Sequence, residues 1–98
     1  MLTLQFTGRI WYWRGPAPWY FVSVPHKHSV ALRAMAPVLT YGWGVIPVTV
    51  RIKKTAWTTS LFPRAELYAV PIRTEVRKAE RLDEGDRVRI ELTTGEPR

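Results

Sequence analysis

Apolar and polar residues alternate along the middle of the chain with the period of two that is typical of β-strands. The apolar set is Ile46, Val48, Val50 and Ile52, which alternates with Pro47, Thr49 and Arg51. A further strand is predicted at about 55–62, so the two segments form a hairpin. A two-residue turn at Lys53–Lys54 would pair Val50 with Trp57, Val48 with Thr59 and Ile46 with Leu61. Lysine is uncommon in such turns, so a longer loop is the alternative.

The same alternation extends to the N-terminal part of the chain. Its apolar positions are Leu2, Leu4, Phe6, Ile10 and Tyr12, and Gly8 between them predicts a bulge or a sharp bend. Further strands are predicted at 19–24, 67–76 and 86–93. Short strands separated by Gly and Pro favour a small barrel or sandwich. We expect a mainly β fold: a closed barrel or pseudo-barrel of about six strands, mostly antiparallel, within one domain of residues 1–98.

One or two short helices are expected at the ends of this barrel. Pro25 suits the first turn of a helix, and residues 26–36 are predicted to be helical until Pro37 ends the segment. The predicted apolar face of this helix is formed by Val30, Ala31, Ala34 and Met35. A short turn or helix is predicted at 77–81, before a turn at Gly85–Asp86.

A weak internal echo relates two parts of the chain. Residues 21–50 and 68–90 both pass from a strand through proline and a helix to a glycine and a second strand. Two related halves would make the protein a single-chain pseudo-dimer, whereas similarity this short also arises by chance.

Short sequence motifs along almost the whole chain match the pattern of a known protein family. They are Trp13, Trp19, Phe21, Val24–Pro25, Gly42–Trp43–Gly44–Val45, Trp57–Thr58–Thr59–Ser60–Leu61–Phe62–Pro63, Tyr68, Val70–Pro71–Ile72–Arg73, Val76–Arg77–Lys78–Ala79–Glu80 and Gly85–Asp86. In this combination the chain resembles a bacterial and archaeal family known as domain of unknown function nineteen-oh-five. The resemblance implies a pseudobarrel similar in shape to the AbrB and MazE transcription factors, and it implies no established activity. Lys53–Lys54 departs from the family's usual hairpin glycine and adds positive charge.

Composition narrows the possible functions. The chain has no cysteine, which excludes disulfides, thiolate catalysis and Cys-ligated zinc. The N-terminal residues lack the pattern of a signal peptide, and no segment has the ~20 apolar residues of a membrane helix. We therefore expect a cytoplasmic location and no membrane partner.

The net charge of +7 is unevenly distributed. Residues 1–65 carry eight basic side chains and no acid, whereas residues 66–98 carry seven basic and eight acidic side chains. A one-sided positive field attracts polyanions, so nucleic acid or an acidic protein is the expected partner. The alternative is that these charges only keep the domain soluble.

Residues that could carry catalysis are few. His26 and His28 point apart on a helix and have no third ligand nearby in sequence, so no metal site is expected. Ser60 lacks the sharp turn of a nucleophile elbow, and no base or orienting acid is identified for it. No phosphate-binding glycine motif is present. We expect a binding protein without a cofactor, as a monomer or weak homodimer, rather than an enzyme.

Two candidate binding sites remain. The first is a basic surface that bears tryptophan, formed by Arg9, Trp11, Trp13, Arg51, Lys53 and Lys54. Exposed tryptophan beside arginine suits single-stranded nucleic acid. Because large rings dominate small cores, the alternative is that the 26–36 helix or the loop 15–18 covers Trp11 and Trp13. The second candidate is a small-molecule or enzyme-accessory pocket near Trp43, Trp57, Thr59, Ser60 and Arg73.

Overall fold

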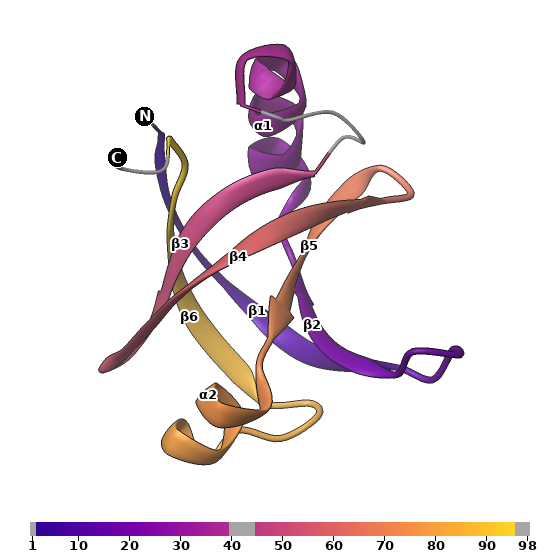
Figure 1. The fold of residues 1–98 in the computed structure, drawn as a ribbon, viewed down its shortest axis with the longest axis vertical. Helices are drawn as coiled ribbons and strands as arrows, with labels where there is room; N and C mark the ends of the chain where they lie inside the picture. Colours follow the sequence, from indigo (N-terminus) through magenta and orange to yellow (C-terminus); the bar gives the residue numbers. More distant parts are fainter. Residues whose placement is uncertain (1, 40–44, 96–98) are drawn as a thin grey trace.

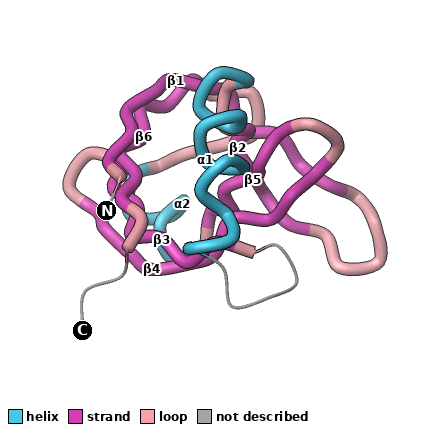
Figure 2. The backbone as a smooth tube through the Cα atoms, turned by 90° about the horizontal axis from the view of Figure 1, so that it is seen from above, coloured by secondary structure: helices cyan, strands magenta, loops and turns pink. Residues whose placement is uncertain are grey.

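The computed structural model describes residues 2–39 and 45–95. Its elements, in chain order, are β1 (Thr3–Trp13), β2 (Trp19–Ser23), α1 (His26–Leu39), β3 (Ile46–Ile52), β4 (Thr55–Arg64), β5 (Leu67–Ile72), α2 (Thr74–Glu80) and β6 (Arg87–Thr93). The strands form a closed antiparallel barrel in the order β1-β2-β5-β4-β3-β6 (Figure 1, Figure 2). The two helices lie at opposite ends of the barrel (Figure 1). The predicted fold class is therefore confirmed.

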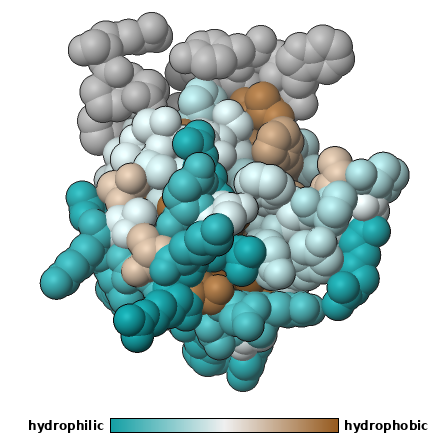
Figure 3. All heavy atoms as spheres, turned by 60° about the horizontal axis from the view of Figure 1, so that its bottom comes forward, coloured by the Kyte–Doolittle hydropathy of each residue, from teal (hydrophilic) through white to brown (hydrophobic). Residues whose placement is uncertain are grey.

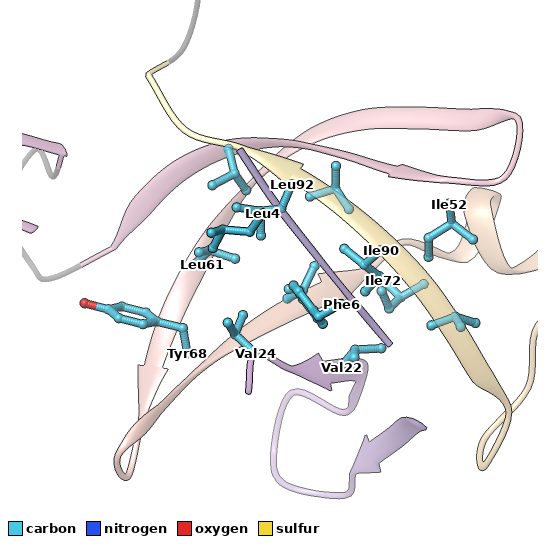
Figure 4. Close-up of a cluster of buried hydrophobic side chains, with 14 of the residues drawn as sticks. Leu4, Phe6, Val22, Val24, Ile52, Leu61, Tyr68, Ile72, Ile90 and Leu92 are labelled. Atoms are coloured by element: carbon cyan, nitrogen blue, oxygen red, sulfur yellow. The ribbon is translucent and has the colours of Figure 1, made fainter. Parts of the chain in front are cut away.

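The apolar positions of the alternating segments fill the interior of the barrel. Every strand sends alternate side chains inward, and among those drawn in Figure 4 are Leu4, Phe6, Val22, Leu61, Ile72, Ile90 and Leu92. Burying one such aliphatic side chain contributes roughly 1.5–3 kcal/mol. The core therefore depends on the period-two pattern of the sequence, which assigns each strand an inner and an outer face.

The β3–β4 hairpin has the predicted register. Val50 pairs with Trp57, and Ile46 pairs with Leu61. The turn consists of Lys53 and Lys54 alone, and Lys53 adopts a positive φ of 53°. A shift of one residue would turn the buried side chains of one of the two strands towards water, so burial sets the register despite the unfavourable turn residues.

Strand β1 changes its pairing partner just after Gly8. It pairs with β6 from Thr3 to Arg9 and with β2 from Ile10 to Trp13. The register with β6 is continuous through Gly8, so the strand has no bulge at this residue. A Cβ atom at Gly8 would lie 2.7 Å from Cγ1 of Val22. Glycine is therefore needed here because β2 approaches closely where β1 curls around the barrel.

Helix α1 is longer than the sequence predicted. It continues to Leu39, so the prediction that Pro37 ends the helix is wrong. Proline removes one backbone donor, and this position lies within the last turn, where few further hydrogen bonds depend on it. No helix among the described residues is both long and apolar enough to cross a membrane.

The predicted apolar face of α1 is also wrong. The structure exposes Val30, Ala31 and Ala34 and leaves Met35 half-buried. Leu32 and Ser29 are buried instead. The Ser29 hydroxyl donates to the Val24 carbonyl (3.0 Å) and accepts from the Tyr68 amide (3.1 Å). These bonds to β5 and to the end of β2 fix the rotation of the helix, which periodicity could not reveal.

The segment after β5 differs from the prediction of a strand at 67–76. The strand ends at Ile72, and α2 begins at Thr74, three residues before the predicted start of a turn or helix. Arg73 between them has extended backbone angles (φ −68°, ψ 151°). Val76 is buried, so α2 turns its apolar side towards the core at that end of the barrel. The left-handed conformation of Arg81 (φ 56°) ends the helix.

The strand order has an internal symmetry. Exchanging β1 with β4, β2 with β5 and β3 with β6 leaves the set of neighbouring strands unchanged. Each half also contains a helix between its second and third strands. This is the arrangement that two related halves would produce. The likeness to AbrB and MazE stays a prediction.

Candidate functional site

Large apolar side chains occupy the outside of the barrel on β1, β2, β4 and β5. Alternation turns Trp11 and Trp13 of β1 outward, because Ile10 and the alternate residues before it face the core. Trp13 pairs with Trp19, and Trp11 pairs with Phe21. Phe21 in turn pairs with Pro71 of β5. The register therefore joins outward-facing side chains from three strands into neighbouring rows.

These rows border a hollow, here called the aromatic groove, with a volume of about 530 Å³. It is lined by Trp11, Trp13, Ala17, Trp19, Phe21, Thr59, Phe62, Pro63, Arg64, Ala69, Pro71 and Arg73. Ala69 and Pro71 are buried although they lie on the outer face of β5. Phe62 and Trp19 are 47% and 40% exposed. The groove thus has a floor of buried small residues and walls of partly exposed aromatic rings.

Trp11 is held in position by three contacts. Its ring stacks on Phe21 with centroids 5.0 Å apart and an interplanar angle of 28°. Its indole Nε1–H donates to Ser23 Oγ at 3.0 Å. The guanidinium carbon of Arg64 lies 5.2 Å from the ring centroid, within range of a cation–π interaction. Trp11 is therefore a fixed wall of the groove rather than a freely rotating side chain.

Trp13 is partly covered by the loop between β1 and β2. A Cβ atom at Gly15 would lie 2.4 Å from Cζ2 of the Trp13 ring. Ala17 of the same loop lines the groove. The expectation that the 15–18 loop covers the tryptophans thus holds in part, because Trp13 stays half-buried and still borders the groove.

Two arginines supply the charge of the groove. Arg73 donates from its guanidinium to the Thr58 carbonyl at 2.9 Å, and Arg64 lies over Trp11. Among residues 2–39 and 45–95, the one ion pair joins Arg14 to Glu84 (3.6 Å). No acidic side chain is present among the described residues that line the groove. Its electrostatic character is therefore positive.

A comparison with models of protein families matches residues 6–92 to the family described as Domain of unknown function (DUF1905). The chain belongs to this family. A search of curated proteins finds no match. The match covers all groove residues, and the predicted resemblance is thus confirmed, but the family description assigns no activity. The function of this DUF1905 domain has to be inferred from its surface.

In this DUF1905 domain, the structure separates the residues of the first predicted binding site, the basic surface that bears tryptophan. Trp11 and Trp13 line the aromatic groove, whereas Arg51 and Lys53 line a different depression of about 340 Å³. That depression is lined by Gln5, Arg51, Ile52, Lys53, Leu82, Arg87, Val88, Arg89 and Glu91. Tryptophans and lysines therefore do not form one surface.

The other two basic residues of the first predicted site both lie near α2, at one end of the barrel. Arg9 donates to the Gly85 carbonyl at 3.1 Å. Lys54 is exposed in the hairpin turn, and its backbone amide donates to a Glu80 carboxylate oxygen at 3.3 Å. Hydrophilic side chains cover much of the molecule towards its α2 end (Figure 3). Neither residue lines the aromatic groove.

The residues of the second predicted site, the small-molecule pocket, are also divided. Thr59 and Arg73 line the groove. Trp57 instead belongs to the core, where its Nε1 atom is buried and has no hydrogen-bond partner among the described residues. Ser60 pairs with Pro47 in the hairpin and does not line the groove. Trp43 lies outside the described residues.

Sequence reasoning missed several residues of the groove. Trp19 and Phe21 alternate with Tyr20 and Val22, so the outward face of β2 was readable from the same period-two pattern. Phe62, Pro71 and Arg64 join the groove only because β2 pairs with β5 and β5 pairs with β4. Such pairing between distant segments has no local signal in the sequence.

The described residues bring no catalytic group into the groove. His26 is exposed on α1, and His28 packs its ring 6.1 Å from that of Phe6. No group of three His, Cys, Asp or Glu side chains comes together there as a metal site in the part of the chain that the structure describes. The arrangement can bind apolar and charged groups, and it offers no acid–base pair.

Proposed function

We propose that this DUF1905 domain is a binding module whose aromatic groove holds a small molecule with a flat ring system. Small-molecule sites are concave, mostly apolar and roughly 300–1,000 Å³ in volume, and the groove of about 530 Å³ lies within that range. The single observation that carries the proposal is that three tryptophans and two phenylalanines line one groove. Flat rings stack favourably on such side chains.

Binding rather than catalysis is supported by the polar groups of the groove. Besides the indole N–H donors of the tryptophans, the described lining residues supply the Thr59 hydroxyl and the guanidinium groups of Arg64 and Arg73. Arginine keeps its proton in proteins and therefore does not act as a general base. A hydroxyl without a neighbouring base is a weak nucleophile. These groups can orient a ligand, and they lack the means to transfer a proton from it.

The test is a titration of the ¹⁵N-labelled protein with 2-naphthalenemethanol, a neutral flat ring. The indole N–H signals of Trp11, Trp13 and Trp19 should shift, while the signal of buried Trp57 stays in place. Phe62→Ala should weaken binding several-fold, because it removes one wall of the groove. Val30→Ala is the matched control, since both side chains are 47% exposed and Val30 lies on α1. The proposal fails if neither this ring nor its anionic analogue 2-naphthoate shifts the groove signals at millimolar concentration.

A second candidate function is the binding of duplex nucleic acid by the basic depression on β3 and β6. The observation that favours it is that Arg87 and Arg89, on one face of β6, line the same depression as Arg51 and Lys53. Glu91 is the one acid of this lining among the described residues. The separation from the tryptophans favours phosphate contacts without base stacking, as on a duplex.

This second function is tested by fluorescence anisotropy with a labelled DNA duplex between 50 and 200 mM salt. Four phosphate contacts predict a slope of about −3 to −4 in log affinity against log salt. The double variant Arg87→Gln/Arg89→Gln should reduce the slope by about half, and Phe62→Ala should leave it unchanged. A slope near zero would remove nucleic acid as a partner of this face.

A further inference from the structure

We infer that the ligand of the aromatic groove is an anion, namely a flat aromatic ring that carries a carboxylate or phosphate group bound by Arg73. The inference rests on the proposed function, because it specifies the ligand of the same groove. It depends on three features: the uncompensated charge of the groove, the fixed position of Arg73, and the apolar surroundings of both arginines.

The groove is positively charged without a countercharge in its lining. Arg64 and Arg73 both line it, and no described lining residue is acidic. The acids nearest to them in sequence are Glu66 and Glu75, which are exposed and outside the lining. Two cations next to apolar walls create a local positive potential, which favours a negative ligand over a neutral one.

Arg73 is suited to bind an oxyanion at a defined place. One terminal nitrogen of its guanidinium donates to the Thr58 carbonyl at 2.9 Å. A guanidinium has five N–H donors, so this bond orients the side chain and leaves further donors for a ligand. Arginine also binds carboxylate and phosphate through two parallel hydrogen bonds, which a lysine cannot reproduce.

Arg64 and the aromatic walls favour the ring of the same ligand. The Arg64 guanidinium lies 5.2 Å from the centroid of Trp11, and Phe21 stacks on that tryptophan. Buried Ala69 and Pro71 form an apolar floor below them. A bare phosphate ion would leave these surfaces uncovered, whereas a neutral ring would offer no acceptor to the guanidinium donors of Arg73 that Thr58 does not use. A ring with an anionic group satisfies both.

The experiment compares four probes by isothermal titration calorimetry: 2-naphthoate, 2-naphthyl phosphate, neutral 2-naphthalenemethanol and inorganic phosphate. At least one of the two ring anions should bind about tenfold more tightly than the neutral ring, as expected for a charge-assisted hydrogen bond. Inorganic phosphate should bind more weakly than the ring anions, and the anion that binds best identifies the acidic group.

Two variants test whether Arg73 causes the tighter binding of the ring anion. Arg73→Met should reduce the affinity for the preferred anion to that of the neutral ring and leave the affinity for the neutral ring nearly unchanged. Arg33→Met is the matched control, since Arg33 is also exposed and also donates to a backbone carbonyl, that of Glu66 (2.8 Å), but lies outside the groove.

Equal affinity of the neutral ring and both anions for the unaltered protein would overturn this inference and leave the groove as a site for neutral rings. Equal losses of affinity for the preferred anion in Arg73→Met and Arg33→Met would also overturn the inference. The advantage of the anion over the neutral ring would then come from the net charge of the protein. If no ring probe shifts the tryptophan signals of the groove, the proposed function fails as well.

Discussion

Replacing Gly8 by alanine tests whether the close approach of β1 and β2 shapes the barrel. The added Cβ would lie 2.7 Å from Cγ1 of Val22, about 1 Å inside an ordinary carbon–carbon contact. Val22 is completely buried and has a stiff, branched side chain, so it cannot move aside easily. Gly8 has no positive φ, so the substitution adds no backbone strain.

The magnitude follows from two opposing effects. Overpacking a core by a methyl group costs about 1–3 kcal/mol. Alanine recovers about 0.5–1 kcal/mol relative to glycine within a strand, because it restricts the unfolded chain. Because the stiff, buried Val22 cannot move aside, the overpacking cost lies in the upper part of its range, about 2–3 kcal/mol. The expected net loss of unfolding free energy is therefore about 1–2.5 kcal/mol, which corresponds to a decrease in Tm of roughly 4–20 °C for a domain of this size.

The assay is urea unfolding followed by circular dichroism for Gly8→Ala, Val22→Ala and the double variant. Because Val22→Ala removes the atom that clashes, the double variant should lose at least about 1 kcal/mol less than the sum of the single variants. Thr7→Ala, at an exposed neighbouring position of β1, should change stability by less than about 0.5 kcal/mol. The reasoning would be refuted if the losses of unfolding free energy were additive, or if Gly8→Ala were as stable as the unaltered protein.

Three further predictions concern elements that the sequence did not resolve. Ser29→Ala should lower the unfolding free energy by about 1–3 kcal/mol in urea melts, because a buried amide and carbonyl lose their shared partner; a change below 0.5 kcal/mol would contradict this. Leu32→Ala should lose about 2–5 kcal/mol, whereas Val30→Ala should lose less than about 0.5 kcal/mol, and the reverse order would show that α1 is rotated. Gly15→Ala should displace the Trp13 ring and change the near-ultraviolet circular dichroism with little loss of stability; an unchanged spectrum would show that the loop does not contact this ring.

The strands and the β3–β4 register were predictable because they depend on local alternation and a short turn. Val50 and Trp57 are separated by few residues, and their pairing follows from the position of the turn. The sequence marked Gly8 as a special position of β1, but it did not give the reason for a glycine there. That reason is Val22, which reaches β1 only after the barrel has closed.

The helices show where periodicity failed. Val30, Ala31 and Ala34 have helical spacing and are small or apolar, yet they are exposed. The rotation of α1 is set instead by Leu32 and by the buried hydrogen bonds of Ser29 to distant backbone groups. A serine that bridges a carbonyl and an amide of other segments carries no sequence signal that distinguishes it from a surface serine.

By itself, the sequence determined the inner and outer faces of the strands, the positive charge of the first 65 residues and the outward position of Trp11 and Trp13. The tertiary structure alone decided which outward residues meet. Barrel closure places β5 between β2 and β4, and this brings Phe62, Arg64 and Arg73 to the tryptophans while leaving Arg51 on another face. The physical reason is that side-chain direction is a local property of the backbone, whereas strand neighbours are chosen by burial of the whole core.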